Sequence, residues 1–276
     1  MSDNKFLTYS EAFNVLADGI LHSGDSINVR SFWEFVRDIW SQGYSHPEYF
    51  KAWHIELICK DVEQALKEEK NYVCILPRMH FKSTVLGYAF SVWRLLSSLD
   101  SSSVLYLSYS DSMSQYHISE MKKHIRSNPA LQGLRDRTPD ADFSFRYFTG
   151  KKQIEVLHGG VFSFKRGIHV GGAMIVDDIL RDPANPLDIS QLFKVENHFF
   201  SETIFIPLRK VPIIVLGTPM APDDLLTKLQ NDERFNSRVL PAFDPVPGRR
   251  VLMPELYDET WLLQQQSSNR TAFASQ

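Results

Sequence analysis

A lysine followed by two hydroxyl residues, Lys82-Ser83-Thr84, stands where an apolar run ends and a helix is predicted to begin. The apolar run is Val73 to Leu76, and a short turn from Pro77 to Phe81 separates it from the lysine. A strand that leads into a helix N-terminus directs unpaired backbone N–H groups and the positive end of the helix dipole at one point. The lysine adds a mobile cation there, and the serine hydroxyl can ligate magnesium. This stretch therefore predicts a triphosphate site.

The glycines of a standard phosphate-binding loop are missing from this stretch. In the spacing G-x-x-x-x-G-K-[ST], glycine would occupy the positions held here by Leu76 and Phe81. The lysine and the hydroxyl residues alone are a weak match, so the prediction depends on partners elsewhere in the chain.

Two adjacent acids, Asp177 and Asp178, end a second apolar run that starts at Ala173. Burying two like charges without partners would be costly. Because side chains alternate along a strand, the two carboxylates are expected to point in different directions and to have different roles. In P-loop ATPases the first acid of such a pair holds magnesium and the second polarises the attacking water. The alternative is that both acids only cap the turn at residues 181–183.

A third apolar run, residues 211–216, ends in the small polar sequence Gly217-Thr218-Pro219. Ligands of an open parallel sheet gather outside the carboxyl ends of the strands. Three strands that end in Lys-Ser, Asp-Asp and Gly-Thr are therefore expected to meet in one crevice.

With these segments taken together, the chain resembles the ATPase domain of the large terminase subunit of tailed bacteriophages, the motor that pumps DNA into viral capsids. Pro77 to Thr84 resembles the loosened Walker A motif of that family, in which an arginine follows the proline and glycines are often replaced. Val176-Asp177-Asp178 resembles its Walker B strand. Leu216 to Pro219 resembles its coupling motif, and Pro222 to Leu225 the polar helix start that follows.

The resemblance implies an α/β fold of the P-loop NTPase class, ASCE type, with a mostly parallel central sheet flanked by helices. It implies three parts: an N-terminal helical segment packed on the nucleotide site (1–69), the ATPase core (70–245) and a linker toward a nuclease domain (246–276). Family members continue into a ribonuclease-H-like nuclease, and Leu262 to Gln276 resembles the segment that leads into it. We therefore expect the sequence to be a truncated form without nuclease activity of its own.

The resemblance also assigns roles, with ATP and Mg²⁺ as the bound groups. Lys82 would contact the β and γ phosphates, Ser83 and Asp177 the magnesium, and Asp178 the attacking water, while Thr218 would sense the γ phosphate. An alternative source of the catalytic carboxylate is Glu196 or Glu202, because aspartate is one methylene shorter than the glutamate common in related motors. The nucleotide-binding set is expected to be Pro77, Arg78, Met79, His80, Phe81, Lys82, Ser83, Thr84 and Thr218.

An arginine finger supplied to a neighbouring subunit would complete such a site. Arg166, in a loop near glycines, is one candidate and Arg126 is its rival; a finger in trans requires a ring. The implied partners are double-stranded DNA, a portal protein, a small terminase subunit and further copies of this chain, with a monomer in isolation. The implied location is the host cytoplasm, without a membrane.

The composition includes 43% hydrophobic and 23% charged residues, and no apolar run approaches the roughly twenty residues of a membrane span. The net charge of −3 does not mark a nucleic-acid binder. The local basic clusters are expected to be solvated faces more than DNA contacts. They are residues 122–126, Arg135 with Arg137, Lys151-Lys152 and Arg249-Arg250.

Hydrophobic periodicity predicts helices at 9–22, 29–41, 48–68, 83–97, 112–127 and 188–201, and strands at 72–76, 104–109, 173–178 and 211–216. Residues 153–157 and 160–164 are predicted to pair as an antiparallel hairpin across His158-Gly159, after an irregular region at 128–150. His54, beside Trp53 on a predicted helix, is expected to be a core histidine, with a place in an adenine pocket as the alternative.

Two other functions remain open. A helicase or translocase of related fold would need a second motor domain, which this length does not allow. A nucleotide-binding scaffold with a decayed loop would explain the lost glycines. The joint presence of Lys82, Ser83, Asp177 and Asp178 argues against decay, since a scaffold could dispense with each of them.

Overall fold

The computed structural model describes residues 31–98, 102–149, 151–164, 167–180, 189–243 and 251–268. The predicted helix at 9–22, the candidate finger Arg166 and the turn at 181–183 lie outside these residues.

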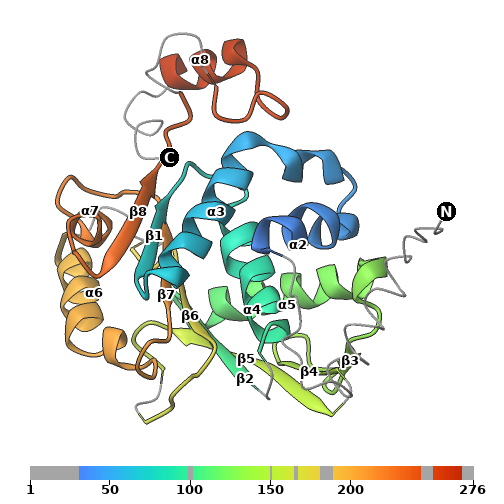
Figure 1. Cartoon of the computed structure of the whole chain (residues 1–276). Helices are drawn as coiled ribbons and strands as arrows, with labels where there is room; N and C mark the ends of the chain where they lie inside the picture. Colours follow the sequence, from blue (N-terminus) through green and yellow to red (C-terminus); the bar gives the residue numbers. More distant parts are fainter. Residues whose placement is uncertain are drawn as a thin grey trace.

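One sheet of eight strands, in the order β3-β4-β5-β2-β6-β7-β1-β8, forms the centre of the molecule (Figure 1). The strands from β5 to β8 in that order run parallel to their neighbours, and β3 and β4 add an antiparallel edge. The predicted α/β class with a mostly parallel sheet is confirmed. The strands are β1 Asn71–Ile75, β2 Ser102–Ser108, β3 Arg135–Asp136, β4 Phe145–Thr149, β5 Lys152–Gly160, β6 Ala173–Asp177, β7 Ile213–Gly217 and β8 Phe235–Val239.

The three strands that end in polar residues are neighbours, with β7 between β1 and β6. Ile75 of β1 pairs with Gly217 of β7, and Leu216 of β7 pairs with Asp177 of β6. The carboxyl ends of β1, β6 and β7 are therefore level, and the loops that follow them leave the sheet at the same edge.

Helices cover both faces of the sheet, so that the molecule has three layers (Figure 1). Alternate residues of each strand enter two separate cores: Tyr72 and Cys74 pack on the side of α2 to α5, whereas Val73 and Ile75 pack on the side of α6 and α7. Burial on both faces explains why these strands are apolar throughout. The helices are α2 Phe32–Asp38, α3 Trp53–Lys67, α4 Phe90–Leu96, α5 Asp111–Ser127, α6 Ile189–Ser201, α7 Leu225–Gln230 and α8 Glu259–Ser268, with 3₁₀ turns at Trp40–Gly43, Pro47–Lys51, Pro129–Leu131 and Thr203–Phe205.

The helix that follows the Lys82 turn starts as a π-helix, Ser83–Ala89, and continues as α4. Sequence periodicity predicts a single α-helix at 83–97 and does not distinguish the wider turn. π-helical turns are rare and occur frequently at functional sites. No helix within the described residues combines the length and the apolar character that a membrane crossing requires.

The hairpin prediction is wrong in its pairing. Residues 152–160 form one uninterrupted strand, β5, whose antiparallel partner is β4 on its N-terminal side. His158 and Gly159 continue the pairing with β2, opposite Tyr106 and Leu107, so they are not a turn. The region 128–150 is also more ordered than expected, since it contains β3, β4 and the 3₁₀ turn at 129–131. The polar character of the region is the reason why its sequence does not predict these strands.

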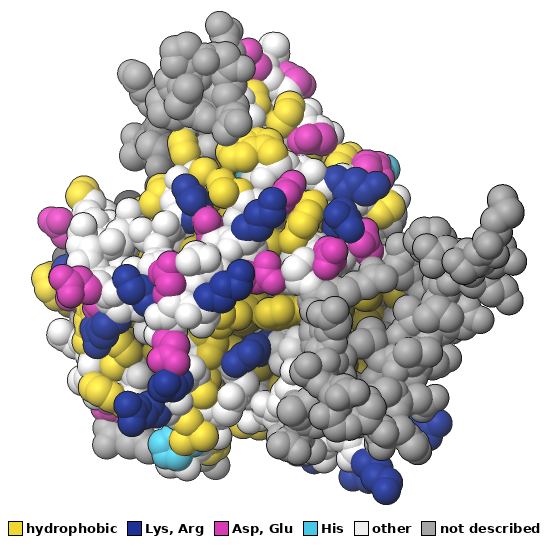
Figure 2. All heavy atoms as spheres, viewed as in Figure 1, with side chains coloured by type: hydrophobic (Ala, Val, Ile, Leu, Met, Phe, Trp, Pro, Cys, Tyr) yellow, Lys and Arg dark blue, Asp and Glu magenta, His cyan; other side chains and the backbone are white. Residues whose placement is uncertain are grey.

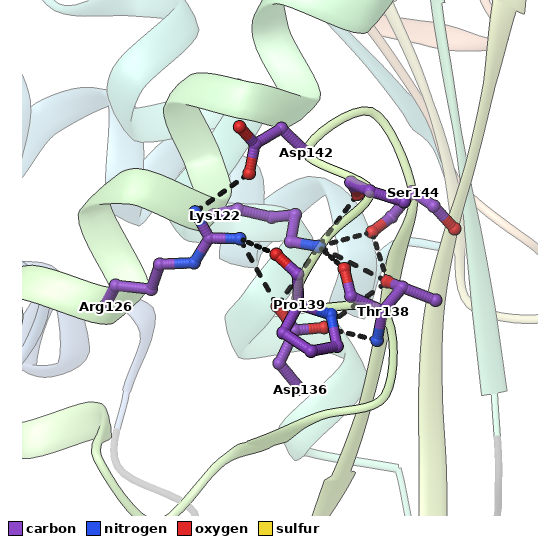
Figure 3. A network of polar contacts seen from close by, with 8 residues as sticks. Lys122, Arg126, Asp136, Thr138, Pro139, Asp142 and Ser144 are labelled. Carbon is purple, nitrogen blue, oxygen red and sulfur yellow. Dashed lines mark hydrogen bonds and ion pairs between the residues drawn. The ribbon is translucent and has the colours of Figure 1, made fainter.

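Two lysines that the sequence places on solvated faces are buried. Lys122 is 0% exposed, and Lys152 is 7% exposed. The Lys122 ammonium donates to the carbonyl oxygens of Thr138, Ala141 and Ser144 at 2.7, 3.0 and 2.8 Å (Figure 3). Lys152 donates to the carbonyl oxygens of Leu95 and Ser98. In each case backbone carbonyl oxygens accept the hydrogen bonds that water would accept from an exposed ammonium. A cluster of charged residues in the sequence does not predict such burial.

The remaining charges mix on the surface. On the face shown in Figure 2, Lys and Arg side chains alternate with Asp and Glu, and no area of a single sign dominates. The totals of the whole chain are also nearly balanced, with 30 basic and 33 acidic residues.

Candidate active site

The turn from Pro77 to Lys82 has a strained backbone at two positions. Met79 has φ of 62° and Phe81 has φ of 65°, in the left-handed region that favours glycine. Phe81 occupies the position where a standard phosphate-binding loop has its second glycine. The turn therefore has a backbone conformation typical of glycine at a position where the residue is phenylalanine.

The contacts of the Phe81 ring explain why a large residue occupies that position. It packs edge-on against Phe50, with ring centroids 5.2 Å apart, and lies 6.4 Å from the Tyr49 ring. These aromatic residues belong to the 3₁₀ turn before α3. Packing against the N-terminal helical layer thus offsets part of the backbone strain.

Lys82 connects the other two strand ends. Its Nζ lies 3.1 Å from Asp178 Oδ2 and 3.4 Å from Thr218 Oγ1, and the side chain is only 7% exposed. Asp178 follows β6 and Thr218 follows β7. The predicted meeting of Lys-Ser, Asp-Asp and Gly-Thr at one edge therefore holds for Lys82, Asp178 and Thr218.

Asp178 is held in a tight backbone conformation with φ of 47°, and its N–H donates to the Leu216 carbonyl at 2.9 Å. Burial raises the pKa of its carboxyl group, and the neighbouring Asp177 raises it further, while Lys82 acts in the opposite direction. The carboxylate is thus placed beside a cation, with a third of its side chain open to solvent.

Asp177, the last residue of β6, contacts a different partner from Asp178. It is 1% exposed, and its Oδ2 accepts a 2.5 Å hydrogen bond from the Tyr106 hydroxyl of β2. Its other oxygen, Oδ1, is buried without a hydrogen-bond partner among the described residues. Burial beside this carboxylate raises the pKa of Tyr106 well above its usual value, so the phenol remains a donor. A buried polar atom without a partner is uncommon in folded proteins, so Oδ1 has room in its bonding for a cation.

A pocket opens at this edge between the β6 and β7 loops. Arg78 from the turn, Asp178 and Thr218 contribute polar groups to its wall. The remaining lining is the backbone near Gly217 and apolar side chains, namely Ile179, Leu180, Leu216, Met220 and Leu226. Arg78 is close enough to Asp178 to lower the pKa of that carboxyl group. The charged groups therefore face a small recess with an apolar back wall.

The turn is also covered by the C-terminal segment. Tyr257, which precedes α8, stacks on Trp261 and lies 5.0 Å from the His80 ring. Its hydroxyl is 3.5 Å from the Met79 carbonyl oxygen. In Figure 1, α8 lies beyond the carboxyl ends of β1 and β8. Residues near both ends of the described chain thus contact the same turn.

His54 and His80 lie side by side behind the turn, with ring centroids 6.3 Å apart. His80 Nδ1 bonds the Arg78 carbonyl, whereas neither ring nitrogen of His54 has a hydrogen-bond partner within the described residues. Burial lowers the pKa of His54 to about 4. The ring is 0% exposed, so His54 is a neutral core histidine in this structure, as expected.

Other candidates lie away from this recess. Glu196 pairs with Lys228 at 2.5 Å between α6 and α7, and Glu202 lies near His198 at the end of α6. The Arg126 guanidinium bonds Asp142 at 2.9 Å and the Pro139 carbonyl (Figure 3). None of these residues lines the pocket beside Asp178.

Sequence reasoning missed Tyr106 and Tyr257. Tyr106 stands in an apolar strand and has the pattern of a core residue, and only the strand order brings it beside Asp177. Tyr257 follows a stretch with weak periodicity. No local signal in the sequence identifies either residue.

Comparison with known proteins supports the fold. No protein-family model matches the chain, and no curated protein matches it in sequence. Among solved structures, the HK97 bacteriophage large terminase aligns over 80% of this chain with a TM-score of 0.56 and 12% identity. The large terminase of a thermophilic bacteriophage aligns over 73% with a TM-score of 0.51 and 12% identity. The fold of the chain is therefore that of phage large terminases, of which it spans about half the length, 48% and 45%.

Proposed function

We propose that this chain is an ATP-hydrolysing motor of the terminase type, which couples hydrolysis to the movement of double-stranded DNA into a viral procapsid. The observation that carries the proposal is the contact of Lys82 with Asp178 and Thr218 at the carboxyl edge of the sheet. The terminase-like fold supports it independently.

Lys82 is the proposed phosphate ligand. In the structure its ammonium is neutralised by Asp178 in a nearly buried position, so it is already desolvated. Phosphate oxygens would take over this role, and backbone N–H groups of residues 77–83 and the Arg78 guanidinium would add donors. Transfer of Lys82 from Asp178 to a phosphate would release the carboxylate.

Asp177 and Ser83 are the residues that would hold Mg²⁺. The fit rests on Asp177 Oδ1, a buried oxygen without a partner among the described residues, and on hard oxygen donors, which suit this ion. Bound Mg²⁺ would neutralise charge on the phosphates. The π-helical turn that carries Ser83 contacts β6, which carries Asp177.

Asp178 would orient the attacking water and accept its proton. Burial raises the pKa of its carboxyl group, which would make it a better base than an exposed aspartate, while the contact with Lys82 lowers that pKa. Thr218, on the same lysine, would respond to the γ phosphate and pass its loss to the loop before α7. Positioning and charge neutralisation supply most of the catalysis of phosphoryl transfer.

The proposed partners are double-stranded DNA, a portal protein and a small terminase subunit, in the host cytoplasm. Further copies of the chain would form a ring, in which Arg166 is the proposed finger. Arg126 is the weaker candidate, because its guanidinium already bonds Asp142 and Pro139.

The experiment is ATP turnover against protein concentration, with and without double-stranded DNA. Lys82→Ala and Asp178→Asn are expected to abolish turnover. Lys60→Ala is the matched control, because Lys60 is also ion-paired, to Glu56 at 2.5 Å, but on an exposed face of α3. It should retain full activity.

A finger in trans predicts turnover that rises more than linearly with concentration and collapses in Arg166→Ala. Loss of activity in Arg126→Ala alone would transfer that role to Arg126. If Lys82→Ala changes neither ATP binding nor turnover, the turn is no phosphate site and the alternative of a scaffold with a decayed loop takes the place of the motor.

A further inference from the structure

The hydroxyl of Tyr106 is the hydrogen-bond donor to Asp177 in the interior of the sheet. The donor and acceptor oxygens are 2.5 Å apart, and Tyr106 and Asp177 are 0% and 1% exposed. We propose that Tyr106 is a positioning residue that fixes the Asp177 carboxylate for its metal ion. The inference rests on the proposed function, because it assumes that Asp177 is a metal ligand.

Strand β2 fixes both the backbone and the side chain of Asp177. Ser108 stands opposite Asp177 in the β2–β6 pairing, and its Oγ donates to the Asp177 carbonyl at 3.1 Å. Two residues earlier on the same face, Tyr106 bonds the carboxylate. Neither contact involves the turn around Lys82, so this arrangement exists before any nucleotide binds.

The hydrogen bond leaves one carboxylate oxygen available. Oδ2 is occupied by Tyr106, whereas Oδ1 is buried and has no partner in the described part of the chain. Rotation of the carboxylate would break a buried hydrogen bond, which is costly in the sheet interior. Tyr106 therefore determines which oxygen is presented, as residues that hold metal-binding carboxylates do.

The same hydroxyl touches the helix that carries Ser83. A Cβ at Gly87, in the π-helical turn, would lie 2.8 Å from the Tyr106 hydroxyl oxygen. Real Cβ atoms do not come this close to another heavy atom, so only glycine allows the hydroxyl to occupy this place. Tyr106 thus lies between the two elements that would supply the metal ligands Ser83 and Asp177.

Neighbouring aromatic residues hold the Tyr106 ring. His117 of α5 packs on it with centroids 5.2 Å apart, and Tyr88 lies 6.2 Å away. Tyr88 donates its own hydroxyl to His117 Nδ1 or accepts from it, at 2.7 Å. Tyr88 therefore provides a matched control: it is a buried, hydrogen-bonded tyrosine in the same cluster, and its hydroxyl does not bond Asp177.

The test compares Tyr106→Phe with Tyr88→Phe in the full chain. Calorimetric titration with ATP at a series of Mg²⁺ concentrations gives the Mg²⁺ concentration at which nucleotide affinity is half-maximal. We expect Tyr106→Phe to raise this concentration roughly 10- to 100-fold, the usual effect of losing a residue that orients a metal ligand. Tyr88→Phe should leave it within about twofold of the wild type. Turnover of Tyr106→Phe should recover at saturating Mg²⁺, so that the KM for the metal changes more than kcat.

Gly87→Ala disturbs the position of the Tyr106 hydroxyl through a change in the π-helical turn and does not remove the hydroxyl. The added methyl group would push the Tyr106 oxygen away from its place, so the Mg²⁺ requirement should rise as in Tyr106→Phe. Should Tyr106→Phe not fold, as judged by circular dichroism, Gly87→Ala carries the same test.

Asp177→Ala separates this inference from the proposed function. If it leaves Mg²⁺-dependent ATP binding intact, Asp177 is no metal ligand and the metal site of the proposed function is wrong. If Asp177→Ala abolishes that binding but Tyr106→Phe and Tyr88→Phe have equal effects, only the positioning role of Tyr106 is overturned.

Discussion

Three residues at the edge of the proposed phosphate site have left-handed backbone conformations: Met79, Phe81 and Asp178. For residues other than glycine this conformation costs roughly 1–2 kcal/mol each, and such strain often occurs where it serves function. The turn around Lys82 therefore differs from a glycine-rich loop in energy while it keeps one of its backbone features. The sequence shows that glycine is absent, but only the structure shows that Phe81 has a left-handed backbone.

Phe81→Gly is expected to be more stable than Phe81→Ala, by about 1 kcal/mol. Both variants lose the ring that contacts Phe50, but only glycine relieves the strain of φ at 65°. The free energy of unfolding of both variants, from urea titrations, tests this order.

The control for this pair is Gln64, an exposed residue in the interior of α3. There the order should reverse, with Gln64→Gly less stable than Gln64→Ala by about 1 kcal/mol, because glycine weakens a helix. If alanine is the more stable residue at position 81 as well, the turn does not have the conformation described.

Among the elements, the segment from β3 to β4 depends on one buried cation. Lys122 of α5 bonds three carbonyl oxygens of this segment and lies 3.1 Å from Asp136 Oδ2 (Figure 3). These contacts tie α5 to the antiparallel edge of the sheet. Asp136 has a lowered pKa, to which Lys122 contributes against the effect of burial.

Lys122→Met is expected to destabilise the protein by roughly 3–5 kcal/mol, because it removes a buried ammonium that bonds three carbonyl oxygens and pairs with Asp136. Arg126→Ala, which removes a cation 43% exposed in the same network, should cost about 1 kcal/mol or less. Denaturant titrations of the two variants measure the difference. Equal decreases in the free energy of unfolding would mean that Lys122 stabilises the protein no more than an exposed ion pair does.

The elements that sequence predicts well are those with a strong pattern of their own. The buried strands β1, β2, β6 and β7 have continuous apolar runs, and α5 has a Ser110 cap and ends before Pro129. Strands β4 and β8 are mixed in polarity and lie toward the sheet edges, so their sequences do not differ clearly from loops. The length of β5 is determined by its pairing with β2, which is too far away in the sequence for a local pattern to predict.

At the scale of the whole molecule, the sequence predicts that Lys82, Asp178 and Thr218 meet, because each follows an apolar run that ends in polar residues. The strand order is the part that sequence could not supply, and with it the contact of Tyr106 with Asp177. The same order places β7 between the strands of the lysine and of the acids. Contacts between residues far apart in the sequence, and not local secondary-structure preference, determine that Tyr106 lies beside Asp177.

The stability of the whole molecule should fall in mild acid through two buried histidines. Burial lowers the pKa of His54 and His124 from 6.5 to about 4 each. Between these values the unfolded chain binds protons and the folded chain does not, so acidification from pH 6.5 to pH 4 favours unfolding. Each histidine would contribute a loss of roughly 3 kcal/mol by pH 4.

His54→Leu should reduce this pH dependence by the share of one histidine, since a leucine of similar size binds no proton. Ile55→Leu, a change at the neighbouring buried residue of α3 that removes no titratable group, should leave the slope unchanged. Unfolding free energies at several pH values between 4 and 7 test both variants. An unaltered slope in His54→Leu would show that His54 takes up its proton equally well in the folded and the unfolded chain.

The stack of Trp261 on Tyr257, which touches His80 and the Met79 carbonyl, makes the C-terminal segment an optical reporter of the turn around Lys82. A rearrangement of the turn around a nucleotide would change the environment of this indole, which is 43% exposed. The intrinsic fluorescence of the chain should therefore shift on addition of ATP and Mg²⁺, and Trp261→Phe should remove most of that shift while ATP binding by calorimetry persists. The state of the turn could then be followed in real time with no added label.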